Sequence, residues 1–111
     1  MYMPVPRDIE AKIYFLTPEE GGRRVPAFTG YRPQFYYNGR DWDGPHAYPD
    51  VDQANPGDTV RAFIGFLSPL EHVGKIYIGM KFLVREGSRT VGRGTVTNIL
   101  ELQESADRAK R

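Results

Sequence analysis

The side chains that could do acid–base or metal chemistry lie close together in the middle of the chain. Asp41 and Asp43 flank Trp42, and Asp50 and Asp52 follow a few residues later. Paired carboxylates can transfer protons or hold a cation. Carboxylates two residues apart on a strand share a face and repel each other unless solvated, and no D-x-D-x-D-G loop surrounds these four. We therefore interpret them as surface residues, and the sequence predicts no metal site.

Other catalytic chemistry has little support in the sequence. His46 and His72 are the only histidines, cysteine is absent, and no Ser–His–Asp arrangement is readable. The stretch Gly87–Gly94 superficially resembles a phosphate-binding loop. Arg93 and Gly94, however, stand where a P-loop has Lys and then Ser or Thr, and a strand follows where a P-loop has a helix. The sequence therefore predicts no catalytic residues, no enzyme activity, no cofactor and no nucleotide binding, and it gives each histidine a structural or solvated role.

Arginines and aromatic residues gather in one part of the chain. The cluster consists of Arg23, Arg24, Tyr31, Arg32, Gln34, Tyr36 and Tyr37. Aromatic rings beside arginines are typical of RNA-binding surfaces and of protein-interaction hot spots. Two interpretations stay open at this point. The cluster is a binding surface, or the tyrosines pack the interior while the arginines stay solvated.

Alternation of apolar and polar residues predicts the elements that position these side chains. No helix of about ten residues is apparent, and turn signals recur every 8–12 residues, as in sandwiches and barrels. We expect an all-β fold, a barrel in which Gly92 and Gly94 permit a bulge or sharp bend in the last strand. The expected strands are 8–15, 31–37, 41–48 (broken at Gly44-Pro45), 60–66, 76–85 and 90–100. The expected core is formed by Val60, Ala62, Ile64, Phe66, Phe82 and Val84.

The 111 residues suit a single domain. We expect residues 1–7 to be an extended lead-in, residues 8–100 to form the barrel, and residues 101–111 to be a polar tail that is a fraying helical turn or disordered. A net charge of +1 argues against a strongly basic nucleic-acid coat. The absence of cysteine favours a cytoplasmic location. We expect no membrane partner, because no apolar run is long enough to span a bilayer and residues 1–7 are no secretory signal.

Four sequence blocks carry a resemblance to a known family. They are Glu-Glu-Gly-Gly-Arg at 19–23, Gly-Tyr-Arg-Pro-Gln-Phe-Tyr at 30–36, Pro-Gly-Asp at 56–58 and Arg-Glu-Gly-Ser-Arg-Thr-Val-Gly at 85–92. In this order and near this spacing they resemble the C-terminal (third) domain of bacterial translation elongation factor Tu. The resemblance implies a six-stranded antiparallel β-barrel, here expected to stand alone without the GTPase domain of the factor.

The resemblance also implies a set of functions and residues. In the family this domain has no catalytic role; it helps to hold the T-stem of aminoacyl-tRNA, packs on the GTPase domain and contributes to the contact with elongation factor Ts. Of the tRNA-facing positions, Gln34 and Gly87 match. Arg24 replaces a His, Asp43 replaces a Thr, and Ser68 stands where the factor often has a basic residue or His, while Ser88 replaces the second glycine of the turn. The implied binding residues are Arg23, Arg24, Tyr31, Arg32, Gln34, Arg85, Gly87 and Arg89.

Three hypotheses follow for function. The first is a non-catalytic binding module that contacts RNA, such as a tRNA, or a translation-machinery protein, such as a translation factor or a GTPase domain. The alternative is a protein-interaction mimic of elongation factor Tu that competes for a toxin or regulator. A third is a remnant whose only inherited property is stability. We expect Arg23, Arg24, Arg32, Gln34, Arg85 and Arg89 to converge on one side of the barrel, with Asp41, Asp43, Asp50 and Asp52 balancing their charge from one loop region elsewhere.

Overall fold

The arrangement of strands is seen in a computed structural model, which describes residues 5–110. Residues 1–4 of the expected lead-in lie outside the described residues. The strands are β1 (Ile9–Phe15), β2 (Ala27–Phe28), β3 (Gln34–Tyr37), β4 (Arg40–Asp43), β5 (His46–Ala47), β6 (Gln53–Ala54), β7 (Thr59–Ile64), β8 (Lys81–Glu86) and β9 (Arg89–Ile99). Two 3₁₀ turns, η1 (Pro18–Glu20) and η2 (Pro69–Glu71), and one helix, α1 (Leu102–Ala109), complete the fold.

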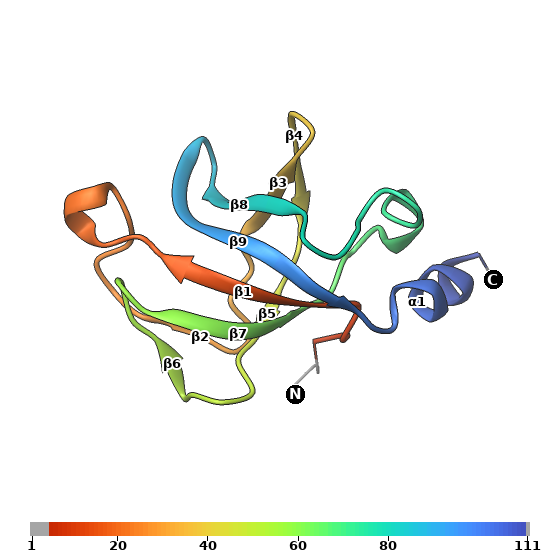
Figure 1. The fold of residues 1–111 in the computed structure, drawn as a ribbon, viewed down its shortest axis with the longest axis horizontal. Helices are drawn as coiled ribbons and strands as arrows, with labels where there is room; N and C mark the ends of the chain where they lie inside the picture. Colours follow the sequence, from red (N-terminus) through yellow and green to blue (C-terminus); the bar gives the residue numbers. More distant parts are fainter. Residues whose placement is uncertain (1–4, 111) are drawn as a thin grey trace.

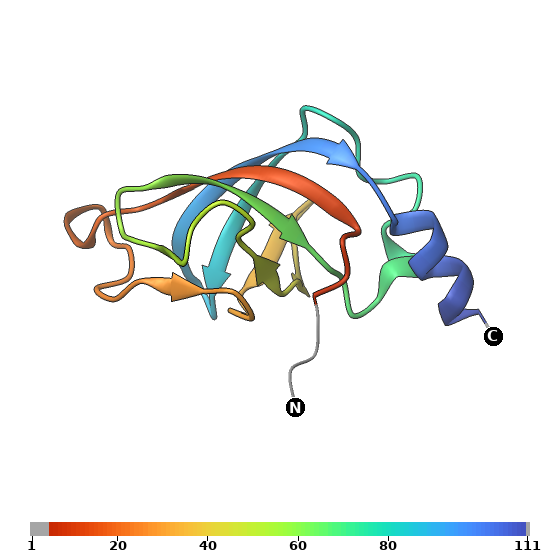
Figure 2. The ribbon, with the colours of Figure 1, turned by 90° about the horizontal axis from the view of Figure 1, so that it is seen from below.

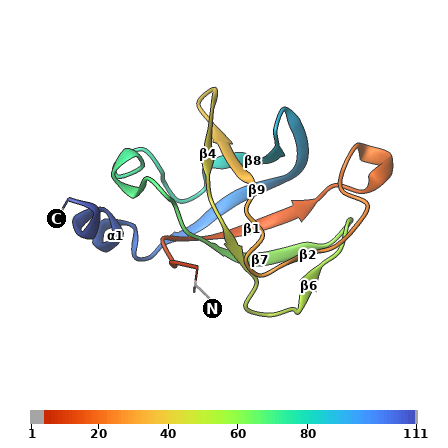
Figure 3. The ribbon, with the colours of Figure 1, turned by 180° about the vertical axis from the view of Figure 1, so that it is seen from behind.

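Seven strands form one antiparallel sheet in the order β4-β3-β8-β9-β1-β7-β5, and β2 pairs with β6 in a separate short ladder (Figures 1 and 3). The two end strands, β4 and β5, are consecutive parts of one segment that is interrupted at Gly44-Pro45. Backbone hydrogen bonds tie this segment to both ends of the sheet. The amide of His46 donates to the carbonyl of Tyr31 (2.8 Å) and the amide of Gly65 to that of Pro45 (3.1 Å). The sheet thus closes with six strand segments, and the expected antiparallel barrel is confirmed.

Apolar residues that alternate along the strands fill the barrel. All six side chains expected in the core are buried. Phe35 lies at the centre, stacked on Phe82 (centroids 4.2 Å apart) and meeting Phe66 edge-on (5.1 Å). Gly94 in β9 lets Phe82 approach the backbone, since a Cβ atom at this position would lie 2.3 Å from the ring. The glycine therefore sets the packing distance between β9 and the aromatic core.

Strand β8 begins later than the sequence predicted. The expected strand 76–85 starts only at Lys81, because Gly79 adopts a φ of +92° that turns the chain ahead of the ladder. Ile76 and Met80 are nevertheless buried, while Tyr77 and Ile78 are each 62% exposed.

The segment expected as a polar tail folds into α1, which packs against η2 at one end of the barrel (Figure 2). Leu102, Ser105 and Ala106 are buried on one face of the helix. The buried Asp8 joins helix and barrel, because its carboxylate accepts hydrogen bonds from the amide of Phe66 (2.8 Å) and from the hydroxyl of Ser105. Burial raises the pKa of this carboxyl group. Among residues 5–110, no helix is long and apolar enough to cross a membrane.

Candidate binding face

Glu86, at the end of β8, is the centre of a cluster that joins three distant stretches of the chain. Its carboxylate forms an ion pair with Arg23 from the loop after η1. The hydroxyl of Tyr31 donates to the same carboxylate at 2.5 Å. Arg89, across the β8–β9 turn, lies 4.0 Å from Glu86 and donates to the carbonyl of Gly22 (3.3 Å). The barrel therefore brings the Gly-Gly-Arg loop, the approach to β3 and the β8–β9 turn together.

Arg23 is the most constrained of the arginines in this cluster. Its side chain is only 20% exposed. The guanidinium lies over the ring of Tyr31, 4.5 Å from the centroid, and donates to the carbonyl of Pro26 at 3.3 Å. A planar guanidinium with a stacking face and several fixed donors is held in one orientation, whereas a lysine ammonium would not be. Arg23 is therefore a structural part of the face.

The protonation states in the cluster are set by burial and by the partners. Burial alone would raise the pKa of Glu86, but the hydrogen bonds from Tyr31 and Arg23 outweigh it, so the pKa is lowered and the carboxylate is charged at neutral pH. Burial, together with the hydrogen bond to Glu86, raises the pKa of Tyr31. The phenol hydroxyl thus remains a hydrogen-bond donor throughout the physiological range.

A second group of predicted residues lies beside this cluster on the outer face of β3, β4 and β8. Gln34 stands opposite Arg85 on one side and opposite Asp43 on the other. Arg85 stacks over Tyr36 (4.4 Å to the centroid), and its Nε atom lies 3.7 Å from a carboxylate oxygen of Asp41. The side-chain oxygen of Gln34 is buried without a hydrogen-bond partner within residues 5–110.

The four aspartates were expected to lie in a loop region apart from the arginines, and this prediction is wrong for two of them. Asp41 and Asp43 do not balance the arginines from a distant loop. They lie within the face, because β4 folds back on β3 as a hairpin and places them beside Gln34 and Arg85. Asp50 does lie elsewhere, where it pairs with Arg61 (2.9 Å). The face is therefore less basic than its arginines alone would make it.

Three predicted residues remain available to a ligand. Arg24 and Arg32 are exposed and form no hydrogen bond or ion pair with the described part of the chain. Gly87, at the tip of the β8–β9 turn, has a φ of +61°, and a Cβ atom placed there would meet no atom within 4 Å. This turn thus presents exposed backbone.

Sequence reasoning did not identify Glu86 as the organising residue. The sequence signal for Glu86 is its position between Arg85 and Gly87 in the 85–92 block, which does not identify a partner. It also missed the cations Lys12, Lys81 and Arg93, because they lie on three different strands and become neighbours only in the folded sheet.

Both histidines belong to the core. His46 is hydrogen-bonded through Nδ1 to the hydroxyl of Tyr48 (2.9 Å), and His72 in the same way to that of Tyr37 (2.8 Å). Burial lowers the pKa of His46 to about 3 and that of His72 to about 4, so both are neutral at physiological pH. No group of three potential metal ligands occurs among residues 5–110.

A closed antiparallel barrel with a surface of arginines, tyrosines and paired carboxylates defines a small β-barrel binding domain. The profile of one family, the elongation factor Tu C-terminal domain, matches residues 4–100. The match covers most of the chain and agrees with the barrel topology, so the chain belongs to this family. In elongation factor Tu this barrel is non-catalytic, and the GTPase activity lies in another domain. Membership thus supports a translation-related binding module.

Proposed function

We propose that this chain is a cytoplasmic, non-catalytic module that binds a tRNA-like RNA through the face around Glu86. The observation that carries the proposal is the pairing of a rigid Arg23–Tyr31–Glu86 cluster with exposed arginines beside it. The rigid part fixes the loop and the turn relative to each other. Arg24, Arg32 and Arg89 can then reach phosphates without first losing much backbone freedom.

The charge of Glu86 determines which arginines are suited to contact phosphates. Glu86 would repel a phosphate that approached Arg23, so Arg23 is the least suitable of the arginines for a direct contact. Arg24 and Arg32 form no ion pair with Glu86, and Arg89 contacts it only at 4.0 Å, so these exposed arginines meet less of that repulsion. The exposed backbone of Gly87 gives the RNA close access to the turn. Three phosphate contacts to duplex RNA should give a slope of roughly −2.7 in a plot of log affinity against log salt, by analogy with duplex DNA.

Fluorescence anisotropy with labelled deacylated tRNA tests this proposal. Arg24→Glu and Arg89→Glu should each weaken binding about tenfold, as expected for the loss of a charge-assisted hydrogen bond, and the double variant should lose more. Lys110→Glu, an equal charge reversal at the far end of α1, is the matched control and should stay within about twofold of wild type. Unchanged tRNA affinity in a folded double variant would contradict the proposal.

A protein partner is the second candidate, and a different observation favours it. The connection between β7 and β8 exposes several large apolar side chains, among them Leu67 (53% exposed), Tyr77 and Ile78 (62% each). Such residues suit a translation factor, a GTPase domain, or a toxin or regulator that normally grips elongation factor Tu. Binding to the isolated GTPase domain of elongation factor Tu, measured by calorimetry, should depend weakly on salt and be lost in Tyr77→Ser/Ile78→Ser. If wild type does not bind this GTPase domain, the GTPase domain is excluded as a partner.

A further inference from the structure

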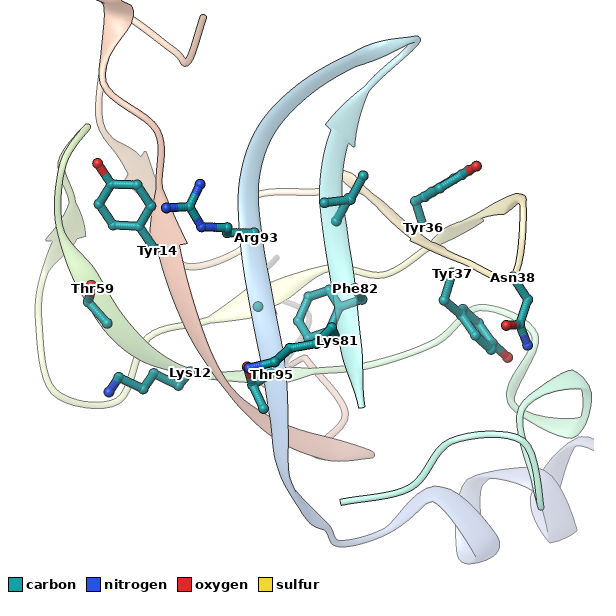
Figure 4. Close-up of a pocket in the computed structure, with 12 residues that line it drawn as sticks. Lys12, Tyr14, Tyr36, Tyr37, Asn38, Thr59, Lys81, Phe82, Arg93 and Thr95 are labelled. Atoms are coloured by element: carbon teal, nitrogen blue, oxygen red, sulfur yellow. The ribbon is translucent and has the colours of Figure 1, made fainter. Parts of the chain in front are cut away.

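A second basic surface lies on the outer face of β1, β9 and β8 and meets the Arg85 side of the first face at Tyr36. It is a hollow of about 700 Å³. Three cations, Lys12, Lys81 and Arg93, line it, and no carboxylate does. Figure 4 shows Arg93 beside Tyr14, with Tyr36 on the far side of β8, Lys12 on β1 and Lys81 on β8 next to Thr95. The proposed function does not use this hollow.

The register of the sheet explains why these residues meet. Thr95 on β9 stands opposite Lys12 on β1 and opposite Lys81 on β8. Arg93, two residues earlier on β9, is therefore on the same outward face and stands opposite Tyr14. Neighbouring strands lie about 4.8 Å apart, so Lys12 and Lys81 are separated by roughly 10 Å across the sheet. This separation is of the order of the spacing between phosphates along a nucleic-acid strand.

The cations have no acidic partner within the described residues. Lys81 donates to the hydroxyl of Thr95 at 2.8 Å, and Lys12 and Arg93 form no ion pair. Arg93 lies instead over the ring of Tyr14, 4.8 Å from the centroid. Because the whole chain carries a net charge of only +1, this local excess of three positive charges is a property of the hollow and not of the composition.

Two carboxylates near the β1 side of this face already have other partners. Glu20 accepts hydrogen bonds from the hydroxyl of Tyr14 (2.6 Å) and the amide of Thr17 (2.9 Å). Glu10 is bound by Arg61 (3.1 Å) and by the hydroxyl of Thr97 (2.9 Å). Glu20 is therefore held at the rim of the hollow by Tyr14, and Glu10 is held by Arg61, and neither carboxylate forms an ion pair with Lys12, Lys81 or Arg93.

We propose that this outer face binds single-stranded nucleic acid. Phosphates would lie over Lys12, Lys81 and Arg93, and bases would pack against the partly exposed rings of Tyr14 and Tyr36. A strip of cations flanked by aromatic rings on the outside of a small barrel is the arrangement that tracks a single strand, because every base has a stacking face and every linkage has a charge. An acidic peptide would use the cations and leave the rings without a role.

Fluorescence anisotropy with a 12-nucleotide oligouridine tests the inference, with oligothymidine of the same length to compare RNA with DNA. In a plot of log affinity against log salt, wild type should give a slope of roughly −2, as expected for three phosphate contacts. Lys12→Ala/Lys81→Ala/Arg93→Ala should weaken binding at least tenfold and bring this slope closer to zero. The matched control is Arg7→Ala/Lys75→Ala/Lys110→Ala, which removes the same charge from exposed positions outside both proposed RNA-binding faces and should change oligouridine affinity less than threefold. Tyr36→Ala should weaken binding about tenfold with the slope unchanged.

Several results would overturn the inference. They are no binding of either oligonucleotide by wild type at 50 mM salt, equal losses in the two triple variants, or a polyglutamate peptide that binds as tightly as oligouridine. Circular dichroism melts establish that each variant is folded. If the triple variant is unstable, Lys81→Ala and Lys12→Ala taken singly must each reduce the salt slope by roughly 0.7. The tRNA measurement is independent, because that probe is expected to respond to the arginine variants and not to these.

Discussion

Replacing Glu86 by glutamine removes the charge at the centre of the binding face and leaves its shape nearly intact. The ion pair with Arg23 and the hydrogen bond from Tyr31 are both charge-assisted, and each such bond contributes roughly 1.5–3 kcal/mol. The contact with Arg89, at 4.0 Å and exposed, adds almost nothing. A glutamine oxygen still accepts one bond, and the Glu86 side chain is 34% exposed, so solvent screening lowers the total. We expect Glu86→Gln to destabilise the fold by about 1.5–2 kcal/mol.

Urea unfolding at pH 7, followed by circular dichroism, measures this loss. Glu19→Gln, on the exposed 3₁₀ turn η1, is the matched control and should change stability by less than about 0.5 kcal/mol. The pKa of Glu86 is lowered in the folded state, so its stabilisation is present above the usual value of 4.5 and lost as the pH falls through the folded value. The difference between wild type and variant should therefore shrink below pH 4.5. Equal stabilities at pH 7, or a difference independent of pH, would refute the role assigned to Glu86.

Other predictions concern the core and nucleotides. Phe66→Ala should cost about 3–5 kcal/mol in urea melts, because Phe66 is buried against Phe35 and His72; a loss below about 1 kcal/mol would contradict this. His46 and His72 stay neutral when folded but take up protons below pH 6.5 when unfolded, so their stabilising effect is present above pH 6.5 and is lost as the pH falls. Between pH 7 and pH 5 each histidine should lower stability by about 2 kcal/mol, while Asp8, whose folded pKa is raised, acts in the opposite direction. Stability that rises between pH 7 and pH 5 would contradict the neutral state assigned to the histidines. Calorimetry with GTP and GDP should give no binding heat, and micromolar affinity would contradict the absence of a P-loop.

The barrel could be predicted from the sequence because its strands are marked by patterns of residues that are close together along the chain. Alternation in Val60–Phe66 determines which side chains enter the core, and Gly44-Pro45 marks the break between β4 and β5. The helix α1 was harder to predict, since its buried face consists of Leu102, Ser105 and Ala106. A buried serine becomes intelligible only when its partner Asp8, 97 residues away in sequence, is known. The same holds for Glu86, whose partner Arg23 is 63 residues distant.

The net charge of the chain is a poor guide to what it can bind, because pairing, and not the sum, decides which charges reach a ligand. A value of +1 counts Arg23 and Arg61 equally with Lys12 and Lys81. Arg23 and Arg61, however, are each engaged by carboxylates. Lys12 and Lys81 have no carboxylate partner among residues 5–110 and share a hollow that lacks one. The acidic residues thus neutralise particular arginines and leave the outer face of the sheet positive, so a nearly neutral chain can still present a surface suited to a polyanion.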